Sequence, residues 1–243
     1  MYGQPACGVK RSVLNLALKL ELAEASIELH EGWKLQEIIE KEESVVAIAA
    51  DGKEVEGSFL IGCDGIKSVT RSLVLAQHDI GEGDASYTGL TQASCYWNTR
   101  NKHLLTRIQE GGMSLTPASL MSNPSKLDIY GPNAHFICYP VSPTTMSWAI
   151  TQKSNTETQE TWRNFTPKET VAQRDILLEQ FRNWGSPVPE LIAGAEGIIK
   201  YGLYDRPQLE PRQWYSLRGR CVLIGDAAHP TSPHLGQGAN QAL

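Results

Sequence analysis

The sequence predicts an α/β fold in which a mostly β subdomain separates two parts of an α/β domain. Two observations indicate the α/β part: an apolar, strand-like run followed by a carboxylate and a glycine-containing turn occurs at residues 59–65 and again at residues 221–226. A third indicates the inserted part, since residues 77–200 change to short strand-like runs with many prolines and a Gly-Gly pair at 111 and 112.

The first elements follow from local pattern. Residues 11–22 place apolar side chains over most of a helical period, which predicts a helix buried over a broad face. Residues 44–50 are β-branched and apolar, Asp51-Gly52 is a turn signal, and residues 59–63 predict a buried strand. This order predicts a hairpin, a central strand and then a short helix over residues 66–75.

In the middle stretch, residues 135–141 and 146–152 predict two paired strands. Thr166 and Pro167 have the residue types of an N-cap and a first helical position, so a helix is predicted over residues 167–184. Residues 220–224 predict a further strand that runs directly into Gly225-Asp226. We therefore expect three segments: 1–76 and 201–243 as parts of one ligand-binding domain, and 77–200 as a substrate-binding subdomain.

Composition excludes several classes of function. The chain has 243 residues, a formal net charge of −5 and a pI near 5.7, with no basic cluster, so neither nucleic acid nor an anionic membrane is expected as a partner. The longest apolar run, residues 45–50, is far shorter than the ~20 residues that span a bilayer. The first residues lack a secretory pattern, and the five cysteines are odd in number and widely spaced, which predicts small buried thiols in a reducing, cytoplasmic setting.

The strongest chemical signal lies near the carboxyl end of the chain. A predicted strand ends at Gly225-Asp226, and a second glycine-rich run, residues 236–240, leads into a helical pattern. Ligands of open α/β sheets bind outside the carboxyl ends of the strands, and a helix N-terminus favours an anionic or electron-rich group. Glycines at 236 and 238 would let the backbone approach a flat ligand. These features predict a ligand site around Asp226.

A second strand–carboxylate–glycine run occurs at Asp64-Gly65, before the predicted helix. Alone it would indicate only a turn. Two such runs in one chain are harder to explain as turns alone.

These runs resemble the two internal fingerprints of the FAD-dependent monooxygenases related to salicylate hydroxylase, para-hydroxybenzoate hydroxylase and zeaxanthin epoxidase. The resemblance implies that Asp226 binds the ribityl chain of FAD and that Gly238 and Ala239 offer backbone contacts to the flavin ring. It also implies that Asp64 lies near the pyrophosphates of FAD and NAD(P)H. Arg11 resembles the family's arginine at the start of a helix along the cofactor. The sequence patterns of residues 203–207 and 135–141 also resemble those of the family.

The fold implied by the resemblance is an FAD-binding, Rossmann-like fold that lacks its first βαβ unit and is interleaved with a mostly β substrate subdomain. Family members begin with a strand, a G-x-G-x-x-G turn, a helix and an acidic residue, and nothing before Arg11 matches this pattern. The last helical pattern also stops at Leu243, where relatives continue. Both ends are therefore expected to be truncated relative to the family.

The function implied is transfer of one oxygen atom from O2 to an electron-rich, aromatic small molecule, with FAD as cofactor and NAD(P)H as co-substrate. Relatives often have an arginine after a Tyr-x-Gly segment, but Ser94 stands near that place after Tyr87-Thr88-Gly89, so no catalytic residue is assigned. The alternative is a truncated, redox-inactive relative that serves as a binding or scaffold protein. The substrate, the choice between NADH and NADPH and the oligomeric state are not indicated.

Other readings of the same residues are weaker. Asp226, His229 and His234 could suggest a metal site, but two prolines interrupt the segment and prevent a rigid ligand face, so no metal is expected. Ser68, His229 and Asp64 could suggest a hydrolase, but no G-x-S-x-G turn is present. His135 and Tyr139 could line a substrate pocket, although such residues in a half-buried strand are more often structural.

Overall fold

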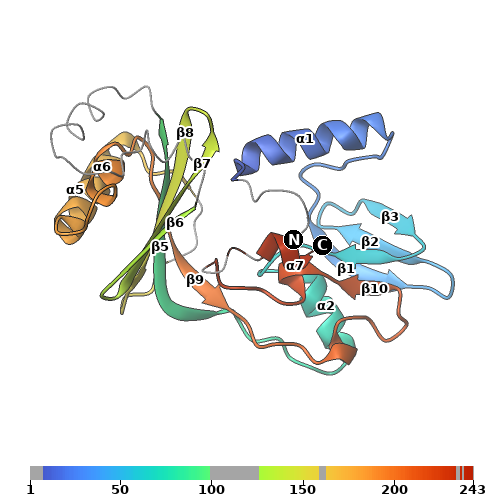
Figure 1. Ribbon diagram of the computed structural model, residues 1–243. Helices are drawn as coiled ribbons and strands as arrows, with labels where there is room; N and C mark the ends of the chain where they lie inside the picture. The colour runs from blue at the N-terminus through green and yellow to red at the C-terminus, as the bar shows by residue number, and fades with distance from the viewer. Residues whose placement is uncertain (1–7, 99–125, 159–162, 234–235, 237, 243) are drawn as a thin grey trace, which may run out of the picture. The chain divides into compact units, whose positions relative to one another are not determined.

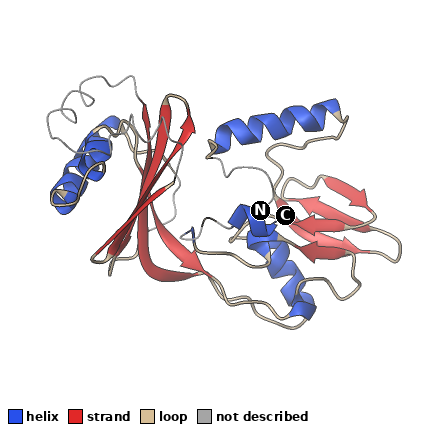
Figure 2. Cartoon of the chain, viewed as in Figure 1, coloured by secondary structure: helices blue, strands red, loops and turns tan. Residues whose placement is uncertain are grey.

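The computed structural model describes residues 8–98, 126–158, 163–233, 236 and 238–242 (Figure 1). The chain divides into two compact units. The first combines Met1–Ile27 with Gly89–Leu203, and the second combines Glu28–Thr88 with Tyr204–Leu243. Strands and helices occur in both, as the colouring of Figure 2 shows, so the predicted α/β class is confirmed.

The second unit begins with an antiparallel sheet of three strands, β1 (Leu35–Glu40), β2 (Val45–Ala49) and β3 (Glu54–Gly57). The β2–β3 hairpin turns at Asp51-Gly52, where Gly52 has a φ of +81°, a conformation that favours glycine. The hairpin that the sequence predicts is therefore confirmed.

A parallel pair, β4 (Leu60–Gly62) and β10 (Cys221–Leu223), lies in the same unit, with α2 (Val69–Gln77) following β4. One face of the pair is covered by a core of apolar residues: Val74, Leu75, Leu209, Cys221, Leu223, Ala227 and Ala228. The strand predicted over residues 59–63 is present as β4, but its predicted burial is wrong, because Ile61 and Phe59 are 48% and 67% exposed. Among the described residues, one face of this pair has an apolar cover, and the alternate side chains of β4 and β10, Ile61 and Val222, are exposed.

The first unit is built on a sheet of five strands in the order β6-β7-β8-β5-β9. Their bounds are Leu127–Gly131 (β6), Ala134–Ser142 (β7), Thr145–Lys153 (β8), Ser86–Asn98 (β5) and Ile199–Asp205 (β9). Strands β7 and β8 pair antiparallel, which confirms the predicted pair. Helices α5 (Pro167–Phe181) and α6 (Val188–Ala193) lie against one face of the sheet (Figures 1 and 2). The core between them includes Trp97, Phe136, Trp148, Ile150, Leu177, Leu191 and Ile198.

Helix α5 begins where the sequence predicts. Thr166 is its N-cap, Pro167 is the first helical residue, and Glu169 completes a capping box in which side chains and backbone N–H groups pair reciprocally. The helix ends at Phe181, three residues before the predicted end, and Trp184 instead packs edge-on against Phe181.

Helix α1 (Arg11–Glu24) is present, as predicted, but its broad buried face is not. None of its residues is buried, and Leu16, Leu18 and Leu20 are each more than half exposed. Its apolar residues lie on several sides of the helix, and no described element covers them. The predicted burial of this helix is therefore wrong for the described part of the chain.

The second unit also contains three short helical elements: η1 (Pro211–Gln213), η2 (Gly225–Ala227) and α7 (Gly238–Ala242). Among the described residues, no helix has the length and apolar character needed to cross a bilayer.

Candidate functional site

The two predicted carboxylates follow neighbouring strands of one sheet. Asp64 comes two residues after β4 and Asp226 three residues after β10, and the strands are parallel, with Gly62 opposite Leu223. The backbone N–H of Ile224 donates to the carbonyl of Gly62 at 2.9 Å. Both loops therefore leave the same edge of the sheet, which is where ligands of open α/β sheets bind.

The Asp226 loop is a single tight turn. Gly225 has a φ of +56°, and a Cβ added there would lie 3.2 Å from the Cβ of Ala242 in α7. The turn therefore requires glycine both for its backbone conformation and for close packing of α7. Asp226 itself is exposed, and no described residue bonds its carboxylate. An exposed carboxylate on this turn can accept hydrogen bonds from the hydroxyl groups of a ligand.

Gly238 begins α7, as the glycine-rich run predicts, and a Cβ added there would lie 3.2 Å from Oγ1 of Thr231. Ala239 follows with an exposed side chain. The described helix has only five residues. The contact of these two residues with a flavin ring stays a prediction.

Asp64 has a different local role. Ser68 Oγ donates to its Oδ1, and the backbone N and Oγ1 of Thr70 donate to its Oδ2 at 3.0 and 3.1 Å. Ser68 in turn caps α2 by accepting from the N–H of Arg71 at 2.8 Å. The carboxylate of Asp64 is therefore already hydrogen-bonded within its own loop. These bonds fix the loop to the start of α2.

Arg71, which the sequence analysis did not single out, connects the two loops. Its guanidinium is 3% exposed, and its Nη1 donates to the carbonyls of Ala227 at 3.1 Å and Ala228 at 3.0 Å. Its Nη2 donates to the carbonyl of Pro207 at 3.0 Å. Burial lowers the pKa of Arg71, and the charge of Glu82 opposes that shift. The start of α2 is thus attached directly to the turn that follows Asp226.

Glu82 joins Arg71 to a second arginine. Its Oε1 lies 2.7 Å from Nε of Arg71 and 2.7 Å from Nη1 of Arg206, and all three side chains are at most 9% exposed. Arg206 also donates to the carbonyls of Ile66 at 2.6 Å and Gly83 at 2.7 Å. Since Ile66 belongs to the Asp64 loop, this ion-pair cluster binds both loops. The sequence gives one indication of this cluster: Arg71 follows the Asp64-Gly65 run, and Arg206 lies within residues 203–207.

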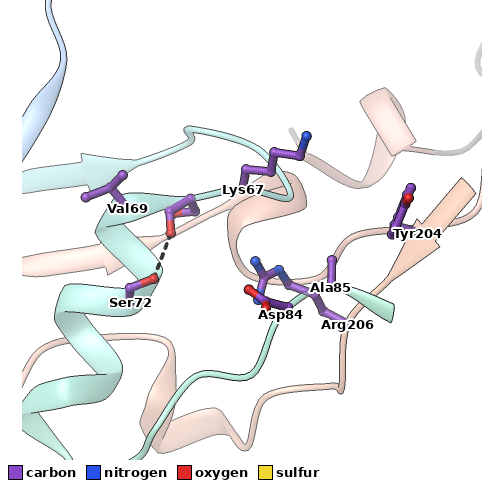
Figure 3. A pocket seen from close by; sticks show the side chains of 8 residues that line it. Lys67, Val69, Ser72, Asp84, Ala85, Tyr204 and Arg206 are labelled. Atoms are coloured by element: carbon purple, nitrogen blue, oxygen red, sulfur yellow. Dashed lines mark hydrogen bonds between the residues drawn. The ribbon is translucent and has the colours of Figure 1, made fainter. Parts of the chain in front are cut away.

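A cavity of about 450 Å³ opens beside the Asp64 loop (Figure 3). Figure 3 shows Lys67 and Arg206 on its wall, from the Asp64 loop and the segment after β9. The volume falls within the range of about 300–1,000 Å³ that small-molecule sites occupy. The full set of lining residues is Lys67, Ser68, Val69, Ser72, Asp84, Ala85, Tyr204 and Arg206.

Arg11 is the first residue of α1, in the other unit, and is exposed. Its role along a cofactor stays a prediction.

The alternative chemistries gain no support from the geometry. His229 stacks on Trp214 with ring centroids 5.3 Å apart, and the hydroxyl of Ser68 is engaged with Asp64, so the hydrolase reading has no geometric basis. His234 lies outside the described residues. Within the described ranges, no group of three or more His, Cys, Asp or Glu residues could hold a metal ion.

The described cysteines are free thiols, of which Cys63 is exposed and the other three buried. The expectation of buried thiols is therefore wrong for Cys63, which follows the half-covered strand β4. Burial raises the pKa of Cys138 and Cys221 to about 12, so neither is a nucleophile at neutral pH.

Comparison with known proteins gives a consistent result. No family model matches the chain. A 3-amino-4-hydroxybenzoate 2-monooxygenase of Streptomyces cremeus is 30% identical over 245 residues, covering 100% of this chain and 52% of that protein. Salicylate hydroxylase of Pseudomonas putida is 28% identical over 215 residues, covering 87% of this chain and 46% of that protein. The chain thus spans about half the length of the curated relatives it matches.

Solved structures show the same fold. HpxO of Klebsiella pneumoniae, in complex with FAD and uric acid, has a TM-score of 0.72 at 21% identity, over 96% of this chain and 52% of that one. A salicylate hydroxylase substrate complex has a TM-score of 0.69 at 24% identity, over 93% of this chain and 53% of that one.

The chain has the FAD-binding fold of the flavin monooxygenases, with two loops at one edge of the sheet. The named relatives are FAD-dependent monooxygenases, and the chain is similar to them over most or all of its own length.

Proposed function

We propose that this chain contributes the FAD- and substrate-binding parts of a monooxygenase that inserts one oxygen atom from O2 into an aromatic small molecule at the expense of NAD(P)H. The observation that carries this proposal is the accessible carboxylate of Asp226, which stands beside the Asp64 loop at the edge formed by β4 and β10. Relatives named as monooxygenases of aromatic acids supply the reaction class.

The Asp226 turn fits the polyol part of FAD. Its carboxylate has no bond to any described residue, and Arg71 fixes the following carbonyls of Ala227 and Ala228. A rigid acceptor with unused lone pairs suits the hydroxyl groups of a ribityl chain. When bound, FAD supplies the redox chemistry, and this chain's residues orient the cofactor and exclude water.

We assign the cavity beside the Asp64 loop to the pyrophosphate-bearing part of a cofactor, FAD or NAD(P)H. Lys67 supplies a positive charge on the wall, which Ser68, Ser72 and the carboxylate of Asp84 also line. Because Asp64 is engaged by Ser68 and Thr70, it contributes by holding this loop rather than by a direct bond to phosphate.

For the substrate we propose an aromatic molecule with a hydroxyl group. Two relatives are named for such compounds, 3-amino-4-hydroxybenzoate and salicylate. We assign its binding to residues 77–200, as the sequence predicts, with the five-stranded sheet as its base. We also propose a reducing compartment, since the described cysteines are unpaired thiols.

The alternative function that the sequence left open is a redox-inactive binding or scaffold protein. A cofactor-free binding protein would have no need of an unpaired carboxylate on a tight turn. Retention of FAD therefore separates the two functions.

The test is the affinity of the chain for FAD, measured by quenching of flavin fluorescence. We expect Asp226→Ala to weaken binding about tenfold to a hundredfold, since a hydrogen bond to a charged group contributes about 1.5–3 kcal/mol. Asp51→Ala, which removes another exposed loop carboxylate, is the matched control and should leave the affinity unchanged. Equal affinities of the wild-type chain and Asp226→Ala would refute the assignment.

A further inference from the structure

A row of polar side chains crosses the five-stranded sheet on the face opposite α5 and α6. Each strand contributes one residue: Asp128 from β6, His135 from β7, Thr151 from β8, Gln92 from β5 and Tyr201 from β9. Thr151 is the register partner of both Gln92 and His135, so these three lie side by side on one face. The alternate residues of β5, β7 and β8 pack in the helix-covered core, and Leu127 and Ile129 of β6 pack against it.

One half of the row is a hydrogen-bonded chain. The hydroxyl of Tyr201 donates to Oε1 of Gln92, and Nε2 of Gln92 donates to Oγ1 of Thr151 at 3.2 Å. All three residues are buried. Burying polar groups is costly unless they are hydrogen-bonded, and an apolar row would serve sheet packing equally well. The row therefore indicates a hydrogen-bonding task.

The other half fixes a histidine. Nε2 of His135 lies 3.0 Å from Oδ1 of Asp128, and the ring of Tyr130 stacks on the imidazole with centroids 4.3 Å apart and planes 8° apart. Nζ of Lys126 lies 3.0 Å from the other oxygen of Asp128. The imidazole is 12% exposed, so its orientation is set by these contacts.

These bonds determine which atoms remain to meet a ligand. A carboxylate only accepts hydrogen bonds, so the proton of a neutral His135 stands on Nε2, and Nδ1 is an acceptor. Oγ1 of Thr151 accepts from Gln92, so the Thr151 hydroxyl keeps its own proton as a donor. An acceptor and a donor therefore stand on neighbouring strands, on one face.

We propose that His135 and Thr151 form the subsite for the hydroxyl group of a phenolic substrate. The phenol O–H donates to Nδ1 of His135, and its oxygen accepts from the hydroxyl of Thr151. Asp128 is a positioning residue that fixes the tautomer and the orientation of His135. This inference rests on the proposed function and adds the residues that select a phenol over its ether.

The subsite predicts discrimination between two ligands that differ by one methyl group. 4-Methoxybenzoate cannot donate to His135, and its methyl group occupies the space of that hydrogen bond. We expect the wild-type chain to prefer 4-hydroxybenzoate by about tenfold or more, because the ether leaves a buried acceptor unpaired. Affinities can be measured by ligand-observed NMR titration of the chain as it is.

Variants test each atom of the proposal. His135→Phe keeps a flat ring against Tyr130 and should abolish the preference, as should Thr151→Val. Thr151→Ser retains the hydroxyl and should keep the preference, whereas Asp128→Asn should reduce it, because an amide can donate to Nε2 and release the tautomer. The control His30→Phe changes an exposed histidine paired with Glu28 and should leave the preference intact.

The outcomes separate this inference from the proposed function. Equal affinity of the wild-type chain for the two ligands, saturable binding of neither, or an unchanged preference in folded His135→Phe would overturn the subsite. A chain that binds FAD but does not discriminate overturns the subsite alone. A chain that discriminates without binding FAD overturns the proposed function and leaves the subsite supported. Circular dichroism confirms that each variant is folded.

Discussion

Replacement of Glu82 by glutamine tests how the Asp64 loop and the Asp226 loop are held together. Glu82 is the only carboxylate that bonds both Arg71 and Arg206 among the described residues, and both arginines meet the same oxygen at 2.7 Å. Ser72 donates to the second oxygen at 2.5 Å. Glu82→Gln keeps the size of the side chain but removes the charge between two buried guanidinium groups.

The expected loss of stability follows from the burial of Arg71, Glu82 and Arg206. Breaking a buried ion pair by removing one partner destabilises a protein by about 3–5 kcal/mol, because the remaining charge is left uncompensated. Here two cations lose their shared partner. A typical domain is stable by only about 5–15 kcal/mol, so the second unit should lose a large fraction of its stability. We also expect weaker FAD binding, because Arg71 holds the carbonyls that follow Asp226.

The assay is urea unfolding followed by the fluorescence of Trp214 and Trp33, the two tryptophans of the second unit. With an m-value of about 1–3 kcal/mol/M, the expected loss shifts the midpoint down by at least ~1 M. Glu56→Gln is the matched control: Glu56 also bonds a serine and a cation, but its pair with Lys41 is about half exposed. Its midpoint should not change measurably. Similar midpoints for the two variants would refute the argument that the cluster holds the loops.

Three further predictions concern other parts of the chain. Gly62→Ala should destabilise the second unit by about 1–3 kcal/mol in urea unfolding, because its Cβ would lie 2.4 Å from Cγ2 of Thr70, whereas Gly57→Ala should be far milder. The pKa of Glu169 is lowered to about 2, chiefly by its bond to Arg163, so its stabilising contribution is complete above pH 4.5 and lost as the pH falls towards 2. Thermal midpoints of the wild-type chain should therefore decline over that window more than those of Glu169→Gln. Leu16→Glu should reduce binding of a hydrophobic dye, because Leu16 is 59% exposed on α1, and an unchanged signal would exclude this helix as the dye site.

Local signals in the sequence predict local structure well. Thr166 and Pro167 predict the start of α5, and the structure adds the reciprocal bond from Glu169. Asp51-Gly52 predicts the β2–β3 turn, which requires the positive φ that glycine readily adopts. These features depend on a few adjacent residues, so no knowledge of the remaining fold is needed to predict them.

Burial and distant contacts are harder to predict from the sequence, because they depend on what packs against an element. The apolar pattern of α1 predicts a buried helix, yet no described residue covers it. The bonds from Arg71 to Ala227 and Ala228 span more than 150 residues of sequence. Nothing in the charges of Arg71, Glu82 and Arg206 indicates that they meet, since these residue types are usually at the surface.

The two strand–carboxylate–glycine runs look alike in sequence but have different physical roles. Both oxygens of Asp64 accept bonds from Ser68 and Thr70, so removing this carboxylate would first release the start of α2. Asp226 has no such partner among the described residues, although its neighbours are held by Arg71. The exposed carboxylate of Asp226 is therefore accessible to a ligand, whereas that of Asp64 is engaged within its own loop. The backbone N–H of Arg71 donates to Ser68 in the first loop, and its guanidinium holds the turn after Asp226, so a ligand on Asp226 and an ordered Asp64 loop should stabilise each other. FAD should therefore raise the unfolding midpoint of the second unit.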